Sequence, residues 1–402
     1  MSVSDEVPTV PDGATIVGPG TIERLPELVA ATAARRVLLV CGRASLEASG
    51  AARILPMLEA QASVLRWDEH RPNPSVEDIV AGLSVAHAHR PDVVVGVGGG
   101  STLDTAKLVA ALHATDDGTD AARTARTIET HDAGAQRGVG LLLAPTTSGS
   151  GAQVTHFATV YVGTAKHSVV GAALLPDRIV LDPALAMSGS AYQRACSGID
   201  ALAQAIESLW AVGADEPSRQ HAEHAIRLLM PAVVRFSREP DEASAEAMAR
   251  GSQEAGSAIN RSRTTLPHAL SYALTQQVGL PHGHAVAHTL PAVLDRHLHA
   301  SDDSLTGVTP SEHRRTLARL QDALGAADAD DAVVRVEAIV TDLGLRDPDR
   351  SRHTGIVAGV DVLADSVDPV RLGNNPVRFT PADLRRIILA GVGTARVEPG
   401  PS

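Results

Sequence analysis

The sequence predicts two domains of different classes: an α/β domain built on a parallel sheet, followed by an all-α domain. Short apolar runs alternate with helical patterns over residues 1–185, as in parallel α/β folds. Over residues 186–402, Ala and Leu recur at helical spacing without a convincing strand. A chain of 402 residues is also long for a single hydrophobic core, so we divide it at 185/186.

The individual elements follow from the apolar runs and their spacing. Runs rich in Val and Leu at 36–40, 92–97 and 139–144 are typical of buried parallel strands. Helical patterns lie at about 46–60 and 75–88, whereas 114–137 has no clear pattern and is predicted to be a surface excursion. In the second half we expect a loop at 302–310 and helices near 191–212, 217–234, 241–260, 266–278, 283–298, 311–325, 331–343 and 381–392.

Composition excludes several classes of function. The chain carries 35 basic and 47 acidic residues, a net charge of −12, without a long basic run, so nucleic acid is not an expected partner. Its two cysteines, Cys41 and Cys196, follow no redox or metal-binding spacing. Residues 1–11 lack the apolar core of a signal peptide, and the sequence has no run of about 18 apolar residues for a membrane span. We therefore expect a cytoplasmic protein without a membrane partner.

A glycine-rich turn follows the second predicted strand. Gly98, Gly99 and Gly100 stand between that strand and the next helix, and Ser101 and Asp104 add polar groups. Three glycines let backbone N–H groups approach an anion closely, and the helix N-terminus adds partial positive charge. A pyrophosphate fits such a turn, although a tight turn that simply needs glycine is the alternative. The turn lacks the Lys-Ser/Thr ending of an ATP-cleaving P-loop, and it also lacks the G-x-G-x-x-G motif of the ordinary dinucleotide fold.

A second polar turn follows the third predicted strand. Its small and hydroxylated residues, among them Thr146, Thr147 and Ser150, suit contacts to a ribose and to the amide of a nicotinamide. Asn73 and Lys166 are two further candidate cofactor-binding residues. The N-terminal half is therefore predicted to be a Rossmann-like dinucleotide-binding domain.

The residues after the first strand bear on the choice between NADPH and NADH. An acidic side chain there would bind the ribose 2′-hydroxyl and repel a 2′-phosphate, but 41–45 contains none. Gly42 leaves room, and Arg43 and Ser45 are able to contact a phosphate. We therefore expect NADPH to be preferred over NADH.

Four polar residues in the second half have the spacing and chemistry of a metal site. Asp200 and Gln204 are four residues apart, so they project from the same face of a predicted helix. His268 and His282 follow, separated by a Gly-Leu-Pro turn. A carboxylate, an amide oxygen and two imidazoles suit zinc, iron or nickel equally. A solvent-exposed helix pair and two unrelated histidines are the alternative.

With these motifs in order, the chain resembles the iron-dependent (group III) alcohol dehydrogenase family from about residue 14 to 395. The resemblance implies a dehydroquinate synthase-like fold, with a helical metal- and substrate-binding domain and the active site in the cleft between the domains. That family usually holds its metal by an Asp, a His one helical turn later, and two further His. The second position is Gln204 here. We expect Fe(II) ahead of Zn(II) or Ni(II), and a homodimer.

A narrower resemblance, to the phosphonoacetaldehyde reductase branch of the family, rests on four short strings at 200–208, 267–272, 279–286 and 374–376. Members of that branch carry glutamine at the second metal position. The resemblance implies NAD(P)H-linked reduction of phosphonoacetaldehyde to 2-hydroxyethylphosphonate during the biosynthesis of phosphonate antibiotics. Residue chemistry alone indicates only a metal-assisted site beside a dinucleotide.

Proton donors and substrate ligands are expected around the two histidines. Tyr272 stands where many family members have another His, and a phenol near a cation is able to donate a proton; an ordinary packed Tyr is the alternative. His284 is the second candidate for the proton relay. A phosphonate needs cations, and the forked guanidinium of Arg263 suits it. The possible hydrogen-bonding supports are Asn260, Ser271 and Asn375.

Other functions stay open at this point. A lyase of the dehydroquinate synthase type shares the architecture, but its phosphate-binding lysine and histidine pattern is absent from the sequence. A member whose metal site is broken by Gln204 would bind nucleotide as a sensor. Another short aldehyde, with a different anionic group, is a further candidate substrate.

Overall fold

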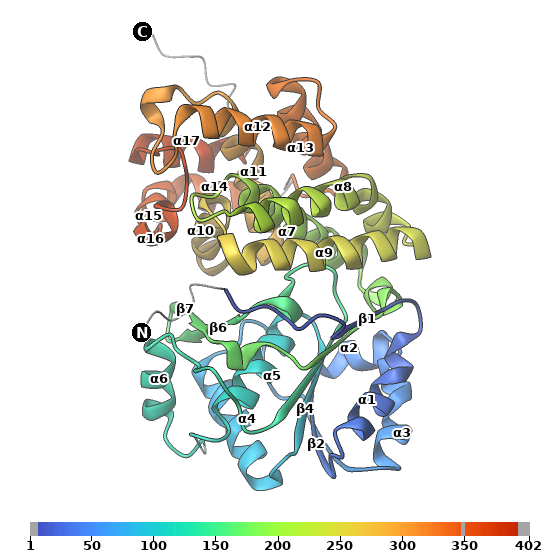
Figure 1. Ribbon diagram of the computed structural model, residues 1–402. Helices are drawn as coiled ribbons and strands as arrows, with labels where there is room; N and C mark the ends of the chain where they lie inside the picture. Colours follow the sequence, from blue (N-terminus) through green and yellow to red (C-terminus); the bar gives the residue numbers. More distant parts are fainter. Residues whose placement is uncertain (1–6, 117, 347–349, 393–402) are drawn as a thin grey trace. The chain divides into compact units, whose positions relative to one another are not determined.

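The computed structural model describes residues 7–116, 118–346 and 350–392, which form two compact units (Figure 1). The first unit runs to Ser190 and takes in Pro240–Ala249, and the second comprises Ala191–Glu239 and the chain from Arg250. The predicted classes are confirmed, since the first unit is α/β and the second is helical. The division at 185/186 stays a prediction, and residues 1–6 of the N-terminal stretch lie outside the described residues.

Six parallel strands form the sheet of the first unit in the order β1-β8-β5-β4-β2-β3. The strands are β1 (Thr15–Val17), β2 (Arg36–Cys41), β3 (Ser63–Trp67), β4 (Val93–Gly98), β5 (Gly140–Pro145) and β8 (Arg178–Leu181). The predicted strands are confirmed as β2, β4 and β5. From β2 the chain continues to β3 on one side, and then crosses over to β4 on the other side of β2. The strand order therefore reverses between β2 and β4. Ligands of open α/β sheets bind at the carboxyl ends of strands beside such a reversal.

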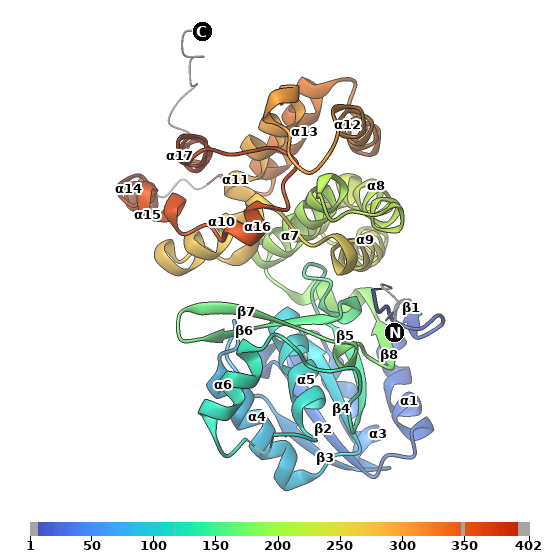
Figure 2. The same cartoon turned by 60° about the vertical axis from the view of Figure 1, so that its left-hand side comes forward.

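Helices cover both faces of this sheet (Figure 2). They are α1 (Leu25–Ala31), α2 (Arg43–Ala48), α3 (Leu55–Glu59), α4 (Val76–His89), α5 (Gly100–Leu112) and α6 (Ala121–Glu129). Along β2, Leu39 belongs to the core cluster that contains residues of α1 and α3. Its neighbours Leu38 and Val40 belong to the cluster that contains residues of α5. Burial on both faces explains why the strands appear in the sequence as continuous apolar runs.

Several elements differ from the sequence-based expectation. The surface excursion predicted for 114–137 contains α6, whose first N–H groups are capped by the Asp120 carboxylate. That helix buries little besides Thr124 and Ile128, so its apolar signal is weak. The helix predicted at 46–60 is interrupted at Gly50, which is left-handed at φ 73°. The edge strands β1 and β3, the strand β8, and the antiparallel hairpin of β6 (Phe157–Val162) and β7 (Ala165–Val170) were not predicted.

The second unit consists of helices in its described part. They are α7 (Ala191–Trp210), α8 (Glu216–Arg238), α9 (Glu242–Ser262, which begins in the first unit), α10 (Leu266–Ala273), α11 (His282–Leu298), α12 (Pro310–Leu324), α13 (Ala329–Asp342), α14 (Arg350–Ala358), α15 (Val360–Asp365), α16 (Pro369–Leu372) and α17 (Pro381–Ala390). The eight predicted helices are confirmed, whereas α14, α15 and α16 were missed. In the part of the chain that the structure describes, none of the helices is long and apolar enough to cross a membrane.

A buried lysine joins α5 to the segment that follows the second polar turn. Lys107 is 0% exposed, and its Nζ donates to the carbonyl oxygens of Ala152 (2.9 Å) and Thr155 (2.8 Å) and to that of Phe157. Asp104 lies one helical turn earlier, with its carboxylate 3.8 Å from the ammonium. These contacts satisfy a charge that would otherwise be costly to bury, and they fix the polar turn to the helix after the glycine turn.

Replacing Lys107 by Met is therefore expected to destabilise the first unit. The substitution keeps most of the side-chain volume but leaves three carbonyls and the Asp104 carboxylate without their buried cation, at a cost of about 3–5 kcal/mol. Differential scanning calorimetry should show the first unit's transition lowered by about 10 °C. The exposed Arg126→Met serves as the control and should melt like the wild type. An unchanged transition in Lys107→Met would contradict this role.

Candidate functional site

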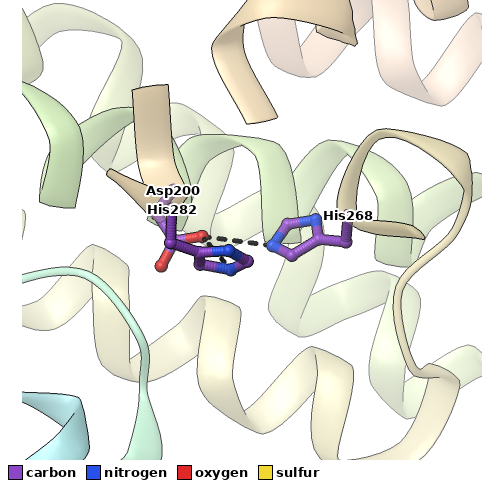
Figure 3. Close-up of side chains that lie close together, drawn as sticks. All are labelled: Asp200, His268 and His282. Atoms are coloured by element: carbon purple, nitrogen blue, oxygen red, sulfur yellow. Dashed lines mark hydrogen bonds and ion pairs between the residues drawn. The ribbon is translucent and has the colours of Figure 1, made fainter. Parts of the chain in front are cut away.

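Three helices of the second unit bring a carboxylate and two imidazoles together (Figure 3). Asp200 comes from α7, His268 from α10 and His282 from the first residue of α11. The Oδ1 atom of Asp200 lies 3.1 Å from Nε2 of His268 and 3.7 Å from Nε2 of His282. One donor atom from each residue lies within 4.8 Å of the others. This spacing suits a divalent ion bound at about 2 Å by each donor.

The start of α11 reaches the cluster by touching the backbone of α7. A Cβ atom at Gly283 would lie 1.9 Å from the carbonyl oxygen of Cys196, closer than any side chain permits. Only glycine therefore allows this approach. Since Gly283 follows His282 directly, and Cys196 lies one turn before Asp200, the contact sets the position of His282 relative to the carboxylate.

Hydrogen bonds fix the orientation of both imidazole rings. Nδ1 of His268 contacts the carboxylate of Glu207, which is fully buried and also accepts the N–H (2.7 Å) and the hydroxyl (2.9 Å) of Thr265. The Ser271 hydroxyl donates to the carbonyl oxygen of His268 (2.7 Å), so it is left to accept from Nδ1 of His282 (3.2 Å). This network assigns the Nδ1–H tautomer to the neutral rings and turns Nε2 of each toward Asp200.

Glu207 was not among the residues predicted from the sequence. It lies three residues after Gln204 and seven after Asp200, so all three share one face of α7. That spacing is a signal in the sequence. It went unused because a carboxylate on a helix face is ordinarily solvated, and the burial of Glu207 is visible only in the tertiary structure.

Gln204 presents an unsatisfied oxygen in the cluster. Its side chain is 4% exposed, and its Nε2 donates to Oδ2 of Asp200 at 3.2 Å. Its Oε1 is buried and, among the described residues, has no hydrogen-bond partner. Buried acceptors are seldom left without a partner, so the amide oxygen fits a fourth ligand position. Two nitrogen and two oxygen donors are compatible with Fe(II), Zn(II) or Ni(II) alike.

The two carboxylates change the protonation of His268. Burial lowers the pKa of this imidazole, but the charges and hydrogen bonds of Glu207 and Asp200 outweigh the burial and raise the pKa to about 10. At neutral pH the metal-free ring therefore holds a proton on Nε2, directed at Asp200. A metal ion must displace this proton, because only neutral imidazole is a ligand.

The glycine turn of the first unit lies at the carboxyl end of β4. A Cβ atom would lie 2.5 Å from Oγ1 of Thr102 if placed on Gly98, and 2.6 Å from Oγ of Ser150 if placed on Gly100. One on Gly99 would lie 3.5 Å from the methyl of Thr147. The turn is thus a cradle that side chains would fill. Among the described residues, no side chain caps the N-terminus of α5, which suits a pyrophosphate.

The turn after β2 and the residue Asn73 border this cradle. Asn73, left-handed at φ 55°, donates its N–H to Oγ of Ser101 at 3.1 Å. A Cβ atom on Gly42 would lie 2.4 Å from Oγ of Ser45 and 3.7 Å from Oγ1 of Thr102. The structure therefore brings these predicted cofactor residues together at the carboxyl ends of β2 and β4.

The side chain of Arg43 projects into solvent beside Asp68, an acidic residue that the sequence did not single out. Arg43 is 73% exposed at its side chain, with Nη2 3.4 Å from Oδ1 of Asp68. Oδ2 of Asp68 is paired with Arg66 at 3.0 Å. Arg66 thus offsets much of the negative charge that Asp68 would otherwise present to a nucleotide phosphate.

Two other predicted cofactor residues, Asp104 and Thr146, are engaged inside the first unit, and Lys166 lies on β7 opposite Tyr161 of β6. The Asp104 carboxylate is 8% exposed and accepts the N–H (3.0 Å) and the hydroxyl (2.8 Å) of Thr159, so it holds the β6–β7 hairpin. Burial raises the pKa of Asp104, and the charges of Lys107 and Lys166 oppose this rise. Thr146 is 5% exposed, with its N–H bonded to the carbonyl oxygen of Gly98 at 2.9 Å. For Asp104 the geometry therefore indicates a structural contact, because its oxygens point into the protein.

One candidate proton donor, Tyr272, lies against the metal cluster, and the other, His284, lies on the same helix as His282. The ring of Tyr272 stacks on that of His282, with centroids 5.9 Å apart and planes 3° apart. His284 is 3% exposed, and its Nδ1 contacts the hydroxyl of Tyr192 at 2.8 Å. Tyr192, which the sequence-based prediction omitted, is 44% exposed, so it links the buried imidazole to solvent.

The candidate substrate residues divide into one partly exposed arginine and three buried supports. Arg263 follows α9 with a left-handed backbone at φ 63°. Asn260 is 2% exposed, and Ser271 holds the ring of His282 as described above. Asn375 is 0% exposed, accepts the N–H of Leu266 at 3.3 Å and donates to the carbonyl oxygen of Leu372 at 2.9 Å. The polar atoms of Ser271 and Asn375 are used inside the protein, which favours positioning roles, and their contact with a substrate stays a prediction.

The chain is similar to known proteins over most of its length. Residues 12–183 match the iron-containing alcohol dehydrogenase family, and residues 194–390 match its C-terminal counterpart. A phosphonoacetaldehyde reductase from Streptomyces viridochromogenes is 34% identical over 78% of this chain and 80% of its own. A long-chain-alcohol dehydrogenase from Geobacillus thermodenitrificans is 30% identical over 95% of this chain and 96% of its own.

Solved structures share the fold at lower identity. An alcohol dehydrogenase from Oenococcus oeni has a TM-score of 0.81 and 20% identity over 96% of this chain and 99% of its own. A sulfoacetaldehyde reductase from Bifidobacterium kashiwanohense, solved with NAD+, has a TM-score of 0.80 and 24% identity over 97% of this chain and 100% of its own. Together with the relatives that align with most of its length, these matches show that the chain is an oxidoreductase that belongs to the iron-containing alcohol dehydrogenase family.

Proposed function

We propose that this enzyme reduces phosphonoacetaldehyde to 2-hydroxyethylphosphonate with a divalent metal ion and NADPH. The observation that carries the proposal is the buried cluster of Asp200, His268 and His282 with the unsatisfied oxygen of Gln204 beside it. The similarity to a phosphonoacetaldehyde reductase supports the choice of substrate. We also propose, from the sequence, that the protein acts as a homodimer.

Asp200, His268, His282 and Gln204 would hold the metal. A divalent ion in this site supplies a Lewis acid for the carbonyl oxygen of an aldehyde. The protein residues around it keep the donor atoms aligned: Glu207 fixes the ring of His268 and Ser271 fixes that of His282. One carboxylate with otherwise neutral donors would leave a divalent ion in this site with a net positive charge, as a Lewis acid requires.

The glycine turn and the turn after β2 would hold the dinucleotide. Reduced nicotinamide supplies the hydride, and the protein contributes binding and orientation. Gly98 and Gly100 keep the pyrophosphate cradle open. Arg43, exposed and only 3.4 Å from the already paired Asp68, is available for the 2′-phosphate of NADPH.

A proton must reach the product oxygen, and Tyr192 with His284 supports a path for it. The Tyr192 hydroxyl contacts solvent on one side and Nδ1 of His284 on the other. His284 lies two residues after the metal ligand His282, at the start of the same helix. Tyr272, stacked on His282, is the second proton donor that the geometry supports.

The substrate proposal predicts a clear order of catalytic efficiency. Because the expected substrate carries an anion, kcat/KM for phosphonoacetaldehyde should exceed that for acetaldehyde by at least about 100-fold. Steady-state rates of NADPH consumption should also be measured with glycolaldehyde and succinic semialdehyde as substrates.

Activity should vanish on removal of metal by a chelator and return with Fe(II), Zn(II) or Ni(II). Equal rates with all four aldehydes, or full turnover by metal-free enzyme, would contradict the proposal.

Metal binding should release protons and strengthen as the pH rises. Since the pKa of His268 is raised to about 10, the ring is protonated in the metal-free protein at pH 7–9 and must lose that proton to bind. Apparent Zn(II) affinity should therefore rise about tenfold per pH unit in this range, with about one proton released per ion. Competition with a chromophoric chelator measures the affinity, and a pH indicator in weak buffer measures the release.

The variant Glu207→Gln tests the cause of this pH dependence. Loss of the carboxylate should return the His268 pKa toward its ordinary value, so fewer protons should be released at pH 8. Zn(II) affinity should fall about 10- to 100-fold, because the ring is less firmly oriented. Glu254→Gln on α9 provides the matched control, since its carboxylate pairs with His221 instead. Proton release equal to wild type in Glu207→Gln would refute the assignment.

Cofactor preference gives a separate prediction. Replacement of Arg43 by Ala should raise the KM for NADPH about tenfold, the loss of one charge-assisted phosphate contact, and leave the KM for NADH within about twofold. Initial rates with each nucleotide at saturating aldehyde decide the question. A higher wild-type efficiency with NADH than with NADPH would show that residues 42–45 have been misinterpreted.

A further inference from the structure

A second arginine lies next to the metal cluster. The guanidinium carbon of Arg371, on α16, lies 4.8 Å from the centre of the Tyr272 ring. That ring stacks in parallel on His282, one of the proposed metal ligands. The sequence-based selection of substrate residues contained no residue of α16. The cation of Arg371 and the imidazole of His282 thus both lie against the ring of Tyr272.

The stacked geometry leaves the guanidinium able to bind an anion. An arginine lying over an aromatic face is held by its π surface, while its N–H groups point outward in the plane and stay available as a fork. Asp368 is 3.8 Å from Nε of Arg371, beyond hydrogen-bond distance, and its side chain is 50% exposed. Such a pair contributes little and does not neutralise the arginine. The Arg371 side chain is 26% exposed, so a solute is able to reach it.

Arg263 brings a second positive charge to the same place. Burial, and to a lesser extent the nearby charge of Arg371, lower the pKa of Arg263 to about 10. The two cations therefore repel one another across a partly desolvated space. The backbone of Arg263 is left-handed at φ 63°, a conformation that is unfavourable for a residue with a side chain. The fold thus maintains both strain and like-charge repulsion at this position, and a bound anion would relieve the repulsion.

Asn374 ties the two arginine-bearing segments together. Its side-chain nitrogen donates to the carbonyl oxygens of Ser262 (2.9 Å) and Thr264 (3.0 Å), on either side of Arg263. Asn374 itself follows α16 by two residues. The neighbouring Asn375 makes a second link, from its side-chain oxygen to the N–H of Leu266. These hydrogen bonds fix the segment that carries Arg263 relative to the segment that follows Arg371.

We propose that Arg371 and Arg263 form a two-arginine site for the phosphonate of the substrate, an inference that rests on the proposed function. In phosphonoacetaldehyde one methylene separates the anion from the aldehyde, so the anion must lie in the layer next to the metal ligands. Arg371 borders that layer, because it contacts the same Tyr272 ring that stacks on His282. Two guanidinium groups match the charge of a dianion, and local cations are needed because the chain as a whole has a net charge of −12.

The test compares substrates in the full-length, metal-loaded enzyme. Arg371→Met should lower the ratio of kcat/KM for phosphonoacetaldehyde to that for acetaldehyde by at least about tenfold, mainly through KM. Arg371→Lys keeps the charge without the fork and should restore part of the ratio. Arg386→Met, whose guanidinium is 60% exposed and paired with Asp383, is the matched control and should keep the wild-type ratio.

A binding measurement separates this inference from the proposed function. Ethylphosphonate carries the anion without an aldehyde, and calorimetric titration should give a Kd at least about tenfold weaker in Arg371→Met than in wild type. Inorganic phosphate in the same titration shows whether the site needs the carbon substituent.

The outcomes are distinct. If wild type reduces phosphonoacetaldehyde but Arg371→Met changes neither ratio nor Kd, the two-arginine site is wrong and the function stands. If wild type fails to reduce phosphonoacetaldehyde yet binds ethylphosphonate through Arg371, the function is wrong and the anion site stands. Absence of ethylphosphonate binding to wild type overturns the site.

Discussion

One buried carboxylate organises the proposed metal site. Glu207 is inaccessible to solvent, and it accepts from His268 and from both the N–H and the hydroxyl of Thr265. A carboxylate buried without partners would be prohibitively costly, so these contacts have to form together. They fix the first turn of α10 against α7 and turn Nε2 of His268 toward Asp200. The ligand geometry, the protonation of the ring and the expected metal affinity all follow from this arrangement.

Close backbone approach complements the carboxylate. Gly283 allows α11 to touch α7 and so positions His282. In the first unit, Gly98 and Gly100 likewise keep the cradle after β4 open. In both units a missing Cβ creates the space that a ligand or a ligand-bearing helix uses. The two sites thus depend on the same steric property, although one is built at the end of a parallel sheet and the other among helices.

Charge is distributed unevenly around the second-unit site. The Asp200 carboxylate, two imidazoles and an amide oxygen surround the proposed place of the metal, whereas Arg371 lies over the Tyr272 ring and its charge acts on Arg263. A short aldehyde that carries an anion matches this polarity, with its carbonyl toward the metal and its anion toward the guanidinium groups. Neutral aldehydes use only half of such a site.

The sequence by itself determined the fold class, the strands β2, β4 and β5 and eight of the helices, and it singled out the residues that we propose hold a metal. These features depend on local periodicity and on residue chemistry at short spacing, both of which are written along the chain. The strands β1 and β3, the hairpin and α6 were not predicted, because short edge strands and weakly buried helices carry little apolar signal in the sequence.

Only the tertiary structure shows which of the candidate polar residues are already engaged within the protein. Asp104, Ser271 and Asn375 have the chemistry of contacts to cofactor or substrate, yet the fold uses their atoms inside the protein. Glu207 and Arg371 look like ordinary surface charges in the sequence, but packing buries one and stacks the other on Tyr272. Burial and partnership arise between residues far apart in the chain, and a local pattern holds no record of them.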